Sequence, residues 1–258
     1  MNTSIALIGG ETFTPDFEST HRQLIELARS SRVDPTDRPV QAVYLVTCAS
    51  HDGVERTDYL RERAQKNLGA QGVKVSTPPV IDHASANDPQ YARMISEADW
   101  IYFSGGHPDV GMQILQDSLV LDAIMTASKH GMLISGSSAG AMILCSHSIV
   151  ITPEMRTAAD RMTKAGQGQG EWQIAHPPVI ECLGLVPTSM CWPHMNRLFS
   201  VNWSRQLLQD GHRIIGIDEQ TAAVRDVSGR WQVWGKGKVL VAAHSCLREY
   251  GPGMDMQL

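Results

Sequence analysis

Residues Met132–Cys145 read MLISGSSAGAMILC, and this stretch indicates the fold more clearly than any other. An apolar strand runs into Gly136–Gly140 (GSSAG), and an apolar segment of helical character follows. The pattern G-x-S-x-G is typical of a sharp strand-to-helix turn that lifts a serine hydroxyl clear of a sheet. The helix behind the serine offers free N–H groups and a positive dipole end. We therefore expect a nucleophile at Ser138, with Ser137 as the neighbouring alternative; a turn that merely lets strand and helix pack closely is the competing interpretation.

Strands and helices alternate through the first half of the chain. The predicted strands are short and apolar: Ser4–Ile8, Val40–Val46, Val73–Ser76, Trp100–Phe103 and Met132–Ile134. Amphipathic spacing or a good helix start predicts the helices: His21–Arg29, Val54–Leu68, Asp88–Ala98 and Leu119–His130. This alternation indicates βαβ units, and strands without polar alternation indicate a sheet covered on both faces. The expected fold class is α/β, with a mostly parallel central sheet and helices on both faces.

The second half of the chain is less regular. Ile214–Ile217 predicts another buried strand, and Arg230–Trp234 and Lys238–Ala242, joined by Gly-Lys-Gly, predict a hairpin. Met155–Gln173 is polar and rich in glycine, so we expect a mobile loop there, on the surface or as a lid over a site. No linker divides the sequence, and residues 1–258 are expected to form a single domain.

Composition argues against several classes of protein. The 258 residues are 42% hydrophobic and 19% charged, as in a globular domain that folds without disulfides or a structural metal. The net charge of -5 weakens the case for nucleic-acid binding, which usually needs a basic face. No window approaches the ~20 apolar residues of a membrane span. The N-terminus MNTSIALIGG lacks the features of a secretory signal.

The cysteines and the missing motifs narrow the chemistry. Five cysteines are widely spaced and form no CxxC pair, which indicates reduced thiols and a cytoplasmic location: Cys48, Cys145, Cys182, Cys191 and Cys246. No spacing typical of metal ligands appears, and neither GxGxxG nor GxxxxGK[ST] is present. We therefore expect no metal and no cofactor.

A nucleophilic serine needs a base, and ten histidines are available. His194 is favoured because it follows the turn-forming Pro193 and precedes a predicted helix. His107 follows Gly105-Gly106 at a strand end and could line the same cleft. His147 lies beyond the helix that follows the serine, which places it too far away.

Carboxylates at two places could orient that base. Glu154 lies just past the elbow helix, and Asp218-Glu219 follows a predicted strand; Asp160 is a weaker alternative. Ends of parallel strands gather at one edge, where open α/β folds bind ligands, so Gly9-Gly10 and the Ser138 turn are expected to share that edge. The residues alone leave the choice of acid open.

Four motifs occur in a fixed order along the chain. They are a strand ending in Gly-Gly (Phe103–Gly106), the elbow (Gly136–Ala141), a Pro-His pair followed by Arg197, and Gly-Ile-Asp-Glu-x-Thr-Ala (Gly216–Ala222). Together they resemble peptidase family S51, which includes cyanophycinase and aspartyl dipeptidase E. The resemblance implies a class I glutamine-amidotransferase-like α/β sandwich with a serine nucleophile, a histidine base and an acidic third residue.

The resemblance assigns roles to individual residues. Ser138 is the implied nucleophile and His194 the implied base. The family's acid falls near Glu154, whereas Asp218-Glu219 matches a family motif and remains an alternative.

The implied oxyanion donors are the backbone N–H groups of Gly106 and Ala139. Gly105, His107 and Arg197 are expected in the same oxyanion and substrate region. This chain has Gly-Gly-His-Pro and Trp-Pro-His where cyanophycinases carry other polar and cationic groups. The acidic-substrate specificity of the family therefore does not follow from the resemblance.

Three functional hypotheses result. The first is a serine peptidase that cleaves a small or extended peptide amide through an acyl-enzyme. The second is an esterase with the same triad, because the elbow does not distinguish amides from esters. The third is a catalytically inert protein that binds small acidic or peptide ligands, with His107-Pro108 marking a changed pocket. A small peptide is the expected partner, and the resemblance adds a homodimer as an expectation.

Overall fold

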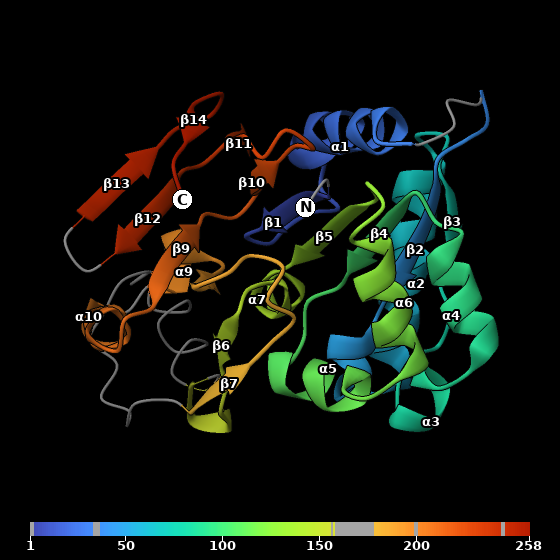
Figure 1. The fold of residues 1–258 in the computed structure, drawn as a ribbon, viewed down its shortest axis with the longest axis horizontal. Helices are drawn as coiled ribbons and strands as arrows, with labels where there is room; N and C mark the ends of the chain where they lie inside the picture. The colour runs from blue at the N-terminus through green and yellow to red at the C-terminus, as the bar shows by residue number, and fades with distance from the viewer. Residues whose placement is uncertain (1–2, 33–36, 156, 158–177, 199–200, 244–245) are drawn as a thin grey trace.

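The structure is a computed structural model that describes the chain apart from residues 1–2, 33–36, 156, 158–177, 199–200 and 244–245. Its centre is an eight-stranded sheet with the order β14-β11-β10-β1-β5-β4-β2-β3 (Figure 1). Five neighbouring strands run parallel: β1 (Ser4–Ile8), β5 (Leu133–Ser137), β4 (Trp100–Phe103), β2 (Gln41–Leu45) and β3 (Lys74–Ser76). Antiparallel strands extend the sheet beyond β1: β10 (Thr221–Arg225), β11 (Trp231–Gly235) and β14 (Asp255–Met256).

Helices connect the strands and cover both faces of the sheet. The α-helices of the first half are α1 (Glu18–Ser30), α2 (Val54–Gly69), α3 (His83–Ala86), α4 (Pro89–Ser96), α5 (Pro108–Leu115), α6 (Leu119–Ala127) and α7 (Ala139–Leu144). Two 3₁₀ helices, η1 (Pro15–Phe17) and η2 (Thr47–Asp52), precede α1 and α2, and the later helices are α9 (Met195–Leu198) and α10 (Val201–Gln209). The side chain of Asp88 accepts a hydrogen bond from Gln90 N and caps α4, as the Asp-Pro pair predicts.

Alternating side chains of the strands pack into two hydrophobic cores. In β1, Ile5 and Leu7 pack with α5, α6 and α7, whereas Ala6 and Ile8 pack with α1 and α2. Successive side chains of a strand point to opposite faces, so a sheet covered twice needs unbroken apolar strands. The predicted α/β fold class is confirmed.

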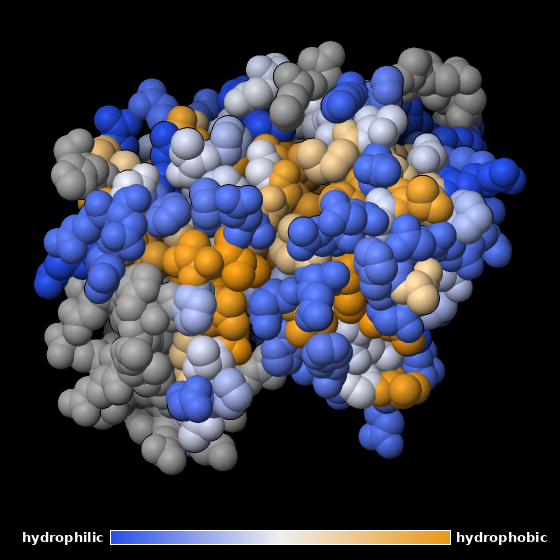
Figure 2. Space-filling model, turned by 60° about the horizontal axis from the view of Figure 1, so that its bottom comes forward, coloured by the Kyte–Doolittle hydropathy of each residue, from blue (hydrophilic) through white to orange (hydrophobic). Residues whose placement is uncertain are grey.

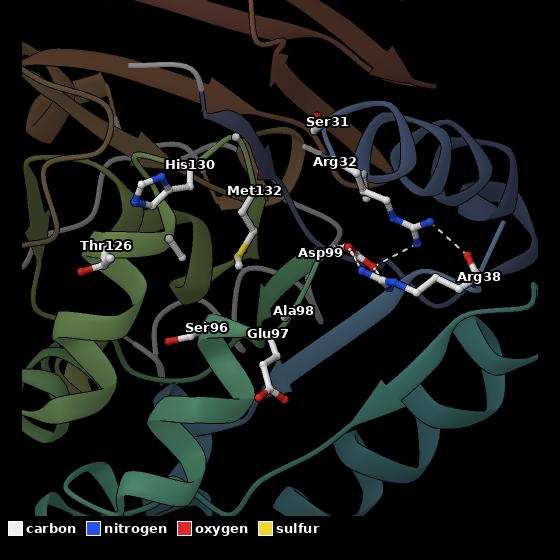
Figure 3. Close-up of a pocket in the computed structure, with 13 residues that line it drawn as sticks. Ser31, Arg32, Arg38, Ser96, Glu97, Ala98, Asp99, Thr126, His130 and Met132 are labelled. Carbon is white, nitrogen blue, oxygen red and sulfur yellow. Dashed lines mark hydrogen bonds and ion pairs between the residues drawn. The ribbon is translucent and has the colours of Figure 1, made fainter. Parts of the chain in front are cut away.

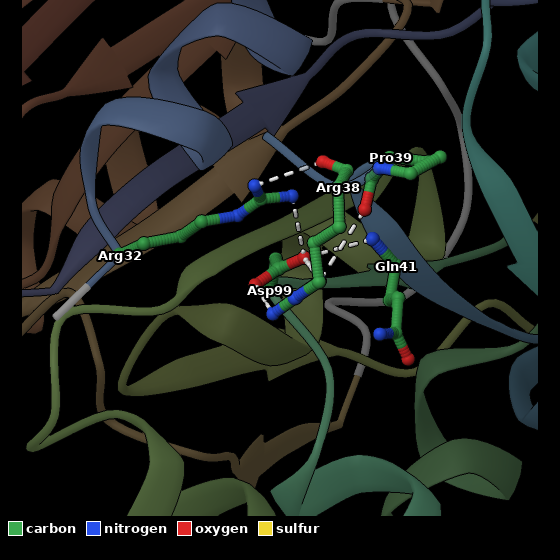
Figure 4. A network of polar contacts seen from close by, with 5 residues as sticks. All are labelled: Arg32, Arg38, Pro39, Gln41 and Asp99. Carbon is green, nitrogen blue, oxygen red and sulfur yellow. Dashed lines mark hydrogen bonds and ion pairs between the residues drawn. The ribbon is translucent and has the colours of Figure 1, made fainter. Parts of the chain in front are cut away.

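A buried ion network locks the amino edge of the parallel strands. Asp99 precedes β4, and its carboxylate accepts hydrogen bonds from Arg38 at 2.7 and 2.8 Å and from Arg32 at 3.0 Å (Figure 4). Gln41 N, at the start of β2, donates to the same carboxylate at 2.8 Å. The side chains of Arg32 and Asp99 are only 3% and 5% exposed. The network therefore ties the end of α1 to the starts of two central strands.

A second, four-stranded sheet follows the order β13-β12-β9-β8. Its strands are β8 (Ser189–Trp192), β9 (Arg213–Ile217), β12 (Val239–Ala243) and β13 (Cys246–Tyr250). The predicted hairpin is wrong, because β11 pairs with β10 and β14, whereas β12 pairs with β9 and β13. Asp218 Oδ2 accepts from Lys238 N at 2.9 Å and Thr221 Oγ1 accepts from Gly237 N at 2.8 Å. These two hydrogen bonds fix the segment between β11 and β12, where the chain passes from the first sheet to the second.

Two further features concern the outer parts of the molecule. A short antiparallel pair joins β6 (His147–Ile149) and β7 (Val179–Glu181). The predicted loop Met155–Gln173 lies almost wholly outside the described residues.

In the described part of the chain, no helix is long and apolar enough to cross a bilayer. Figure 2 shows a face on which apolar side chains lie in bands between hydrophilic ones.

Candidate active site

Ser138 lies at the turn between β5 and α7, and its backbone is strained. Its φ of 55° and ψ of -121° lie outside the regions that side-chain-bearing residues prefer. Its N–H donates to Ile8 O at 2.9 Å, which fixes the turn against β1. A Cβ on Gly136 would lie 2.1 Å from Gly140 O, so the turn requires glycine at this place. This geometry agrees with the elbow that the motif predicts.

His194 follows β8 and reaches the serine from the second sheet. Its N–H donates to Gly9 O at 2.8 Å, and its φ is 52°. A hydrogen bond of 3.0 Å joins His194 Nε2 to Ser138 Oγ. A Cβ on Gly10 would lie 2.2 Å from His194 Cε1, so a side chain there would displace the ring. Gly10 thus makes room for the histidine.

Glu219, after β9, contacts the other ring nitrogen. Its Oε1 lies 2.8 Å from His194 Nδ1 and also accepts from Arg197 Nη1 at 2.8 Å. Partial burial raises the pKa of the Glu219 carboxyl, but the hydrogen bond to His194 and the charges of His194 and Arg197 outweigh it, so the pKa falls below its ordinary value. The carboxylate is therefore ionised beside the imidazole at neutral pH.

The structure does not bring Glu154, the expected acid, to the histidine. Glu154 is exposed, and its carboxylate is hydrogen-bonded by its own backbone N–H and by Thr152. Both ring nitrogens of His194 have other partners, Ser138 and Glu219. Glu154 follows the C-terminal end of α7, whereas Ser138 precedes its N-terminal end, and the six residues of this helix separate its two ends by about 9 Å.

The alternative Asp218 has a structural partner. Its Oδ2 accepts the backbone N–H of Lys238 at 2.9 Å, in the crossing between the two sheets. The two neighbouring acids therefore have different partners: Asp218 contacts the segment that joins the two sheets, and Glu219 contacts His194.

Gly105 lies directly against the serine, and Gly106 lines the same cavity as Ser138. A Cβ on Gly105 would be 3.1 Å from Ser138 Cβ. Gly106 has φ 140°, and a Cβ on it would be 2.1 Å from Cys48 O. Ala139 is the first residue of α7, where N–H groups lack intrahelical partners. The segments expected to supply oxyanion donors are thus next to the serine, Ala139 in the chain and Gly105-Gly106 in the cavity lining.

His107 contacts another loop rather than the serine. Its Nε2 lies 3.0 Å from Asp52 Oδ1, and its N–H donates to Cys48 O at 2.6 Å. Asp52 and Cys48 both belong to η2. The sequence placed His107 in the cleft region, and the structure brings its side chain to the neighbouring η2 segment.

A cavity of about 190 Å³ opens beside Ser138 and His194. Its lining includes Arg56 and Arg63 from α2, which the sequence analysis did not single out. Burial raises the pKa of Tyr44 in the cavity wall, and the positive charges of Arg56 and Arg63 offset part of this rise, so both cations act on that wall. A sequence signal existed, because α2 follows β2 and starts at the edge where the serine lies.

Another cavity lies near the amino edge of the sheet. It measures about 360 Å³ and is lined by the Asp99 network together with Thr126, His130 and Met132 (Figure 3). Its arginines already bond Asp99, and it is separate from the serine. In the described residues no group of three or more histidines, cysteines or carboxylates could hold a metal ion.

Ser138 lies in a strained strand-to-helix turn and is hydrogen-bonded to a histidine, which is in turn hydrogen-bonded to a carboxylate. This arrangement on an α/β scaffold is typical of a serine hydrolase. The model of peptidase family S51 matches residues 5–228, and the chain belongs to this family.

Two solved structures share the fold. A peptidase from an acI-B1 Actinobacterium aligns with a TM-score of 0.79 and 22% identity, covering 99% of this chain and 97% of that chain. A candidate peptidase E protein from Listeria monocytogenes EGD-e aligns with a TM-score of 0.55 and 16% identity, covering 96% of this chain and 98% of that chain. No curated protein matches.

Proposed function

We propose that the chain is a serine peptidase in which Ser138, His194 and Glu219 act as nucleophile, base and orienting acid. The observation that carries this proposal is the unbroken pair of hydrogen bonds, 3.0 Å from Ser138 Oγ to His194 Nε2 and 2.8 Å from His194 Nδ1 to Glu219. Arg197 supports the arrangement, because its charge keeps Glu219 ionised and thereby favours the imidazolium form during reaction.

The reaction would follow the acyl-enzyme course. His194 Nε2 takes the proton of Ser138 as Oγ bonds to the carbonyl carbon of the scissile amide. The N–H groups of Gly106 and Ala139 stabilise the oxygen anion of the tetrahedral intermediate. His194 then gives the proton to the amine as the carbon–nitrogen bond breaks, and water releases the acyl group by the same steps.

The cavity favours a substrate with an anionic group. Its volume of about 190 Å³ leaves room for a side chain beside the scissile bond. Arg56 and Arg63 supply positive charge on the wall formed by α2, and Arg63 is held by a hydrogen bond of 2.7 Å to Phe13 O. The carboxylates of Glu11 and Asp52 belong to other parts of the same lining. These two arginines of α2 would take the place of the cationic groups that cyanophycinases carry after the histidine. A peptide with an acidic residue or a nearby carboxylate is the substrate that this wall would recognise.

Hydrolysis of a small peptide panel tests this function. The panel contains Asp-X dipeptides, β-Asp-Arg, and dipeptides with neutral or basic first residues, each with a matched ester. We expect turnover of the acidic peptides by the wild type, loss in Ser138→Ala, and a raised KM in Arg56→Gln and Arg63→Gln. Equal turnover by wild type and Ser138→Ala would refute the nucleophile, and turnover confined to esters would refute the peptidase.

The setting of the enzyme is part of the proposal. We propose that residues 1–258 act as one catalytic domain in the cytoplasm, supported by five free cysteines, three of them buried. A homodimer is retained from the family resemblance, and light scattering on the purified protein tests it.

A further inference from the structure

Two loops meet beside the serine, and their contact decides where the Gly106 N–H lies. The first loop contains η2 and follows β2; the second, from Ser104 to His107, follows β4. Gly106 packs so closely on η2 that a Cβ would lie 2.1 Å from Cys48 O. His107 N donates to the same Cys48 O at 2.6 Å. The second loop therefore takes its position from the first.

A side-chain bond adds a second point of attachment. His107 Nε2 lies 3.0 Å from Asp52 Oδ1, at the end of η2, and the two side chains are 18% and 27% exposed. Asp52 lines the catalytic cavity with Gly106 and Ser138. One backbone hydrogen bond allows a segment to rotate about it, whereas a second bond some distance away removes that freedom. The pair therefore braces the second loop directly after its two glycines.

The bracing matters because this segment is intrinsically loose. Gly105-Gly106 has no side chains to hold it, and fixing one glycine costs more backbone entropy than fixing any other residue. An oxyanion donor contributes most when it is in place before the reaction starts. Small misplacements of such a group have large kinetic effects.

We propose that His107 and Asp52 form a positioning pair that holds the Gly106 N–H for the oxyanion of the transition state. This inference rests on the proposed function, in which Gly106 is an oxyanion donor. The pair acts through the backbone of Gly106 and does not touch the substrate. His107 is thus assigned a supporting role, and the ground-state affinity for the substrate does not depend on it.

The test compares His107→Ala, Asp52→Ala and the double variant with His107→Gln, whose amide can still donate to Asp52. His51→Ala is the matched control, because His51 is exposed on the same 3₁₀ segment. Four quantities are measured: kcat and KM for the best peptide of the panel, the inhibition constant of the corresponding peptide boronic acid, and the dissociation constant of the peptide on the Ser138→Ala background. The boronic acid forms a tetrahedral adduct on the serine and reports on the oxyanion site.

We expect kcat to fall by about 10- to 100-fold in the alanine variants, somewhat less than the loss of a whole oxyanion donor. Boronic acid affinity falls by the same factor, and peptide affinity on the Ser138→Ala background changes less than about threefold. The double variant loses no more than either single variant, since neither partner acts alone. His107→Gln recovers most of the loss, and His51→Ala equals the wild type.

Three results would overturn the inference. Unchanged kcat and boronic acid affinity in both alanine variants would show that the pair does not position Gly106. A loss of peptide affinity equal to the loss of boronic acid affinity would make His107 or Asp52 a substrate ligand. If lowering the temperature fully restored kcat in the variants, the pair would only contribute to global stability, which the melting temperature of each variant reports. A wild type that neither hydrolyses peptides nor binds the boronic acid would instead refute the proposed function, and the pair with it.

Discussion

His21 makes the stability of this protein depend on pH in a calculable way. The residue is 1% exposed and lies among aromatic rings, with ring centroids 5.0 Å from Phe17 and 5.3 Å from Phe13. Burial lowers the pKa of His21 to about 4. An unfolded chain has an ordinary histidine pKa of about 6.5. The native state therefore holds His21 neutral at a pH where the unfolded chain already binds a proton.

The sign and size of the effect follow from this difference. Below pH 6.5 His21 binds a proton in the unfolded state but not in the native state, so the free energy of unfolding falls as the pH decreases. The fall continues until about pH 4, where the pKa of the native His21 is reached. A difference of about 2.5 pKa units corresponds to about 3 kcal/mol. This is a large share of the ~5–15 kcal/mol that stabilises a typical domain.

Urea unfolding at pH 7.5, 6.0, 5.0 and 4.5, followed by circular dichroism, measures the effect. Other groups also titrate in this range, so the comparison is with His21→Leu, which cannot take up a proton. The variant has a constant packing offset, and we expect the difference in unfolding free energy between wild type and variant to change by about 2–3 kcal/mol between pH 7.5 and 4.5. A difference that stays constant within about 0.5 kcal/mol would refute the reasoning.

Three further predictions concern other parts of the molecule. Asp99→Asn leaves the buried charge of Arg32 without its carboxylate, so urea unfolding should show a loss of about 3–5 kcal/mol; a loss below about 1 kcal/mol would contradict the network's role. Gly140→Ala would place a Cβ 2.5 Å from Phe103 O, so we expect a clearly lower melting temperature and lost turnover, and wild-type values would show that the elbow tolerates a side chain. Cys246 is exposed, so a thiol reagent should label it rapidly in the native protein, and Cys246→Ser should abolish this fast phase; its survival would point to one of the other thiols.

The sequence pattern predicts the first half of the chain well because local and tertiary preferences agree there. Short apolar strands could only be stable in a doubly covered sheet, and β1, β2, β4 and β5 form that sheet. The elbow could also be predicted, because only glycine fits at Gly136 and Gly140. These features depend on neighbours in sequence or on hydrophobicity alone.

The remainder depended on contacts that a pattern does not encode. Arg230–Trp234 and Lys238–Ala242, joined by Gly-Lys-Gly, have the pattern of a hairpin, yet the pattern does not state which strand is the partner. Hydrogen bonds to Asp218 and Thr221 direct the second of these strands to another sheet. The choice of acid is an example: the residues left Glu154, Asp218 and Glu219 open, and the family resemblance favoured a position near Glu154. Only the packing of the second sheet brings Glu219 to His194.

The comparison of Glu219→Gln with Glu154→Gln tests the central claim most directly. Both substitutions remove one carboxylate with little change in shape, and kcat is measured on the best peptide of the panel after both variants are shown to be folded. We predict that Glu219→Gln lowers kcat by about 10⁴-fold, as loss of the orienting acid does in serine triads. We predict that Glu154→Gln keeps kcat within about twofold, because surface substitutions away from a site have small effects. A severe loss in Glu154→Gln together with full turnover in Glu219→Gln would contradict the account.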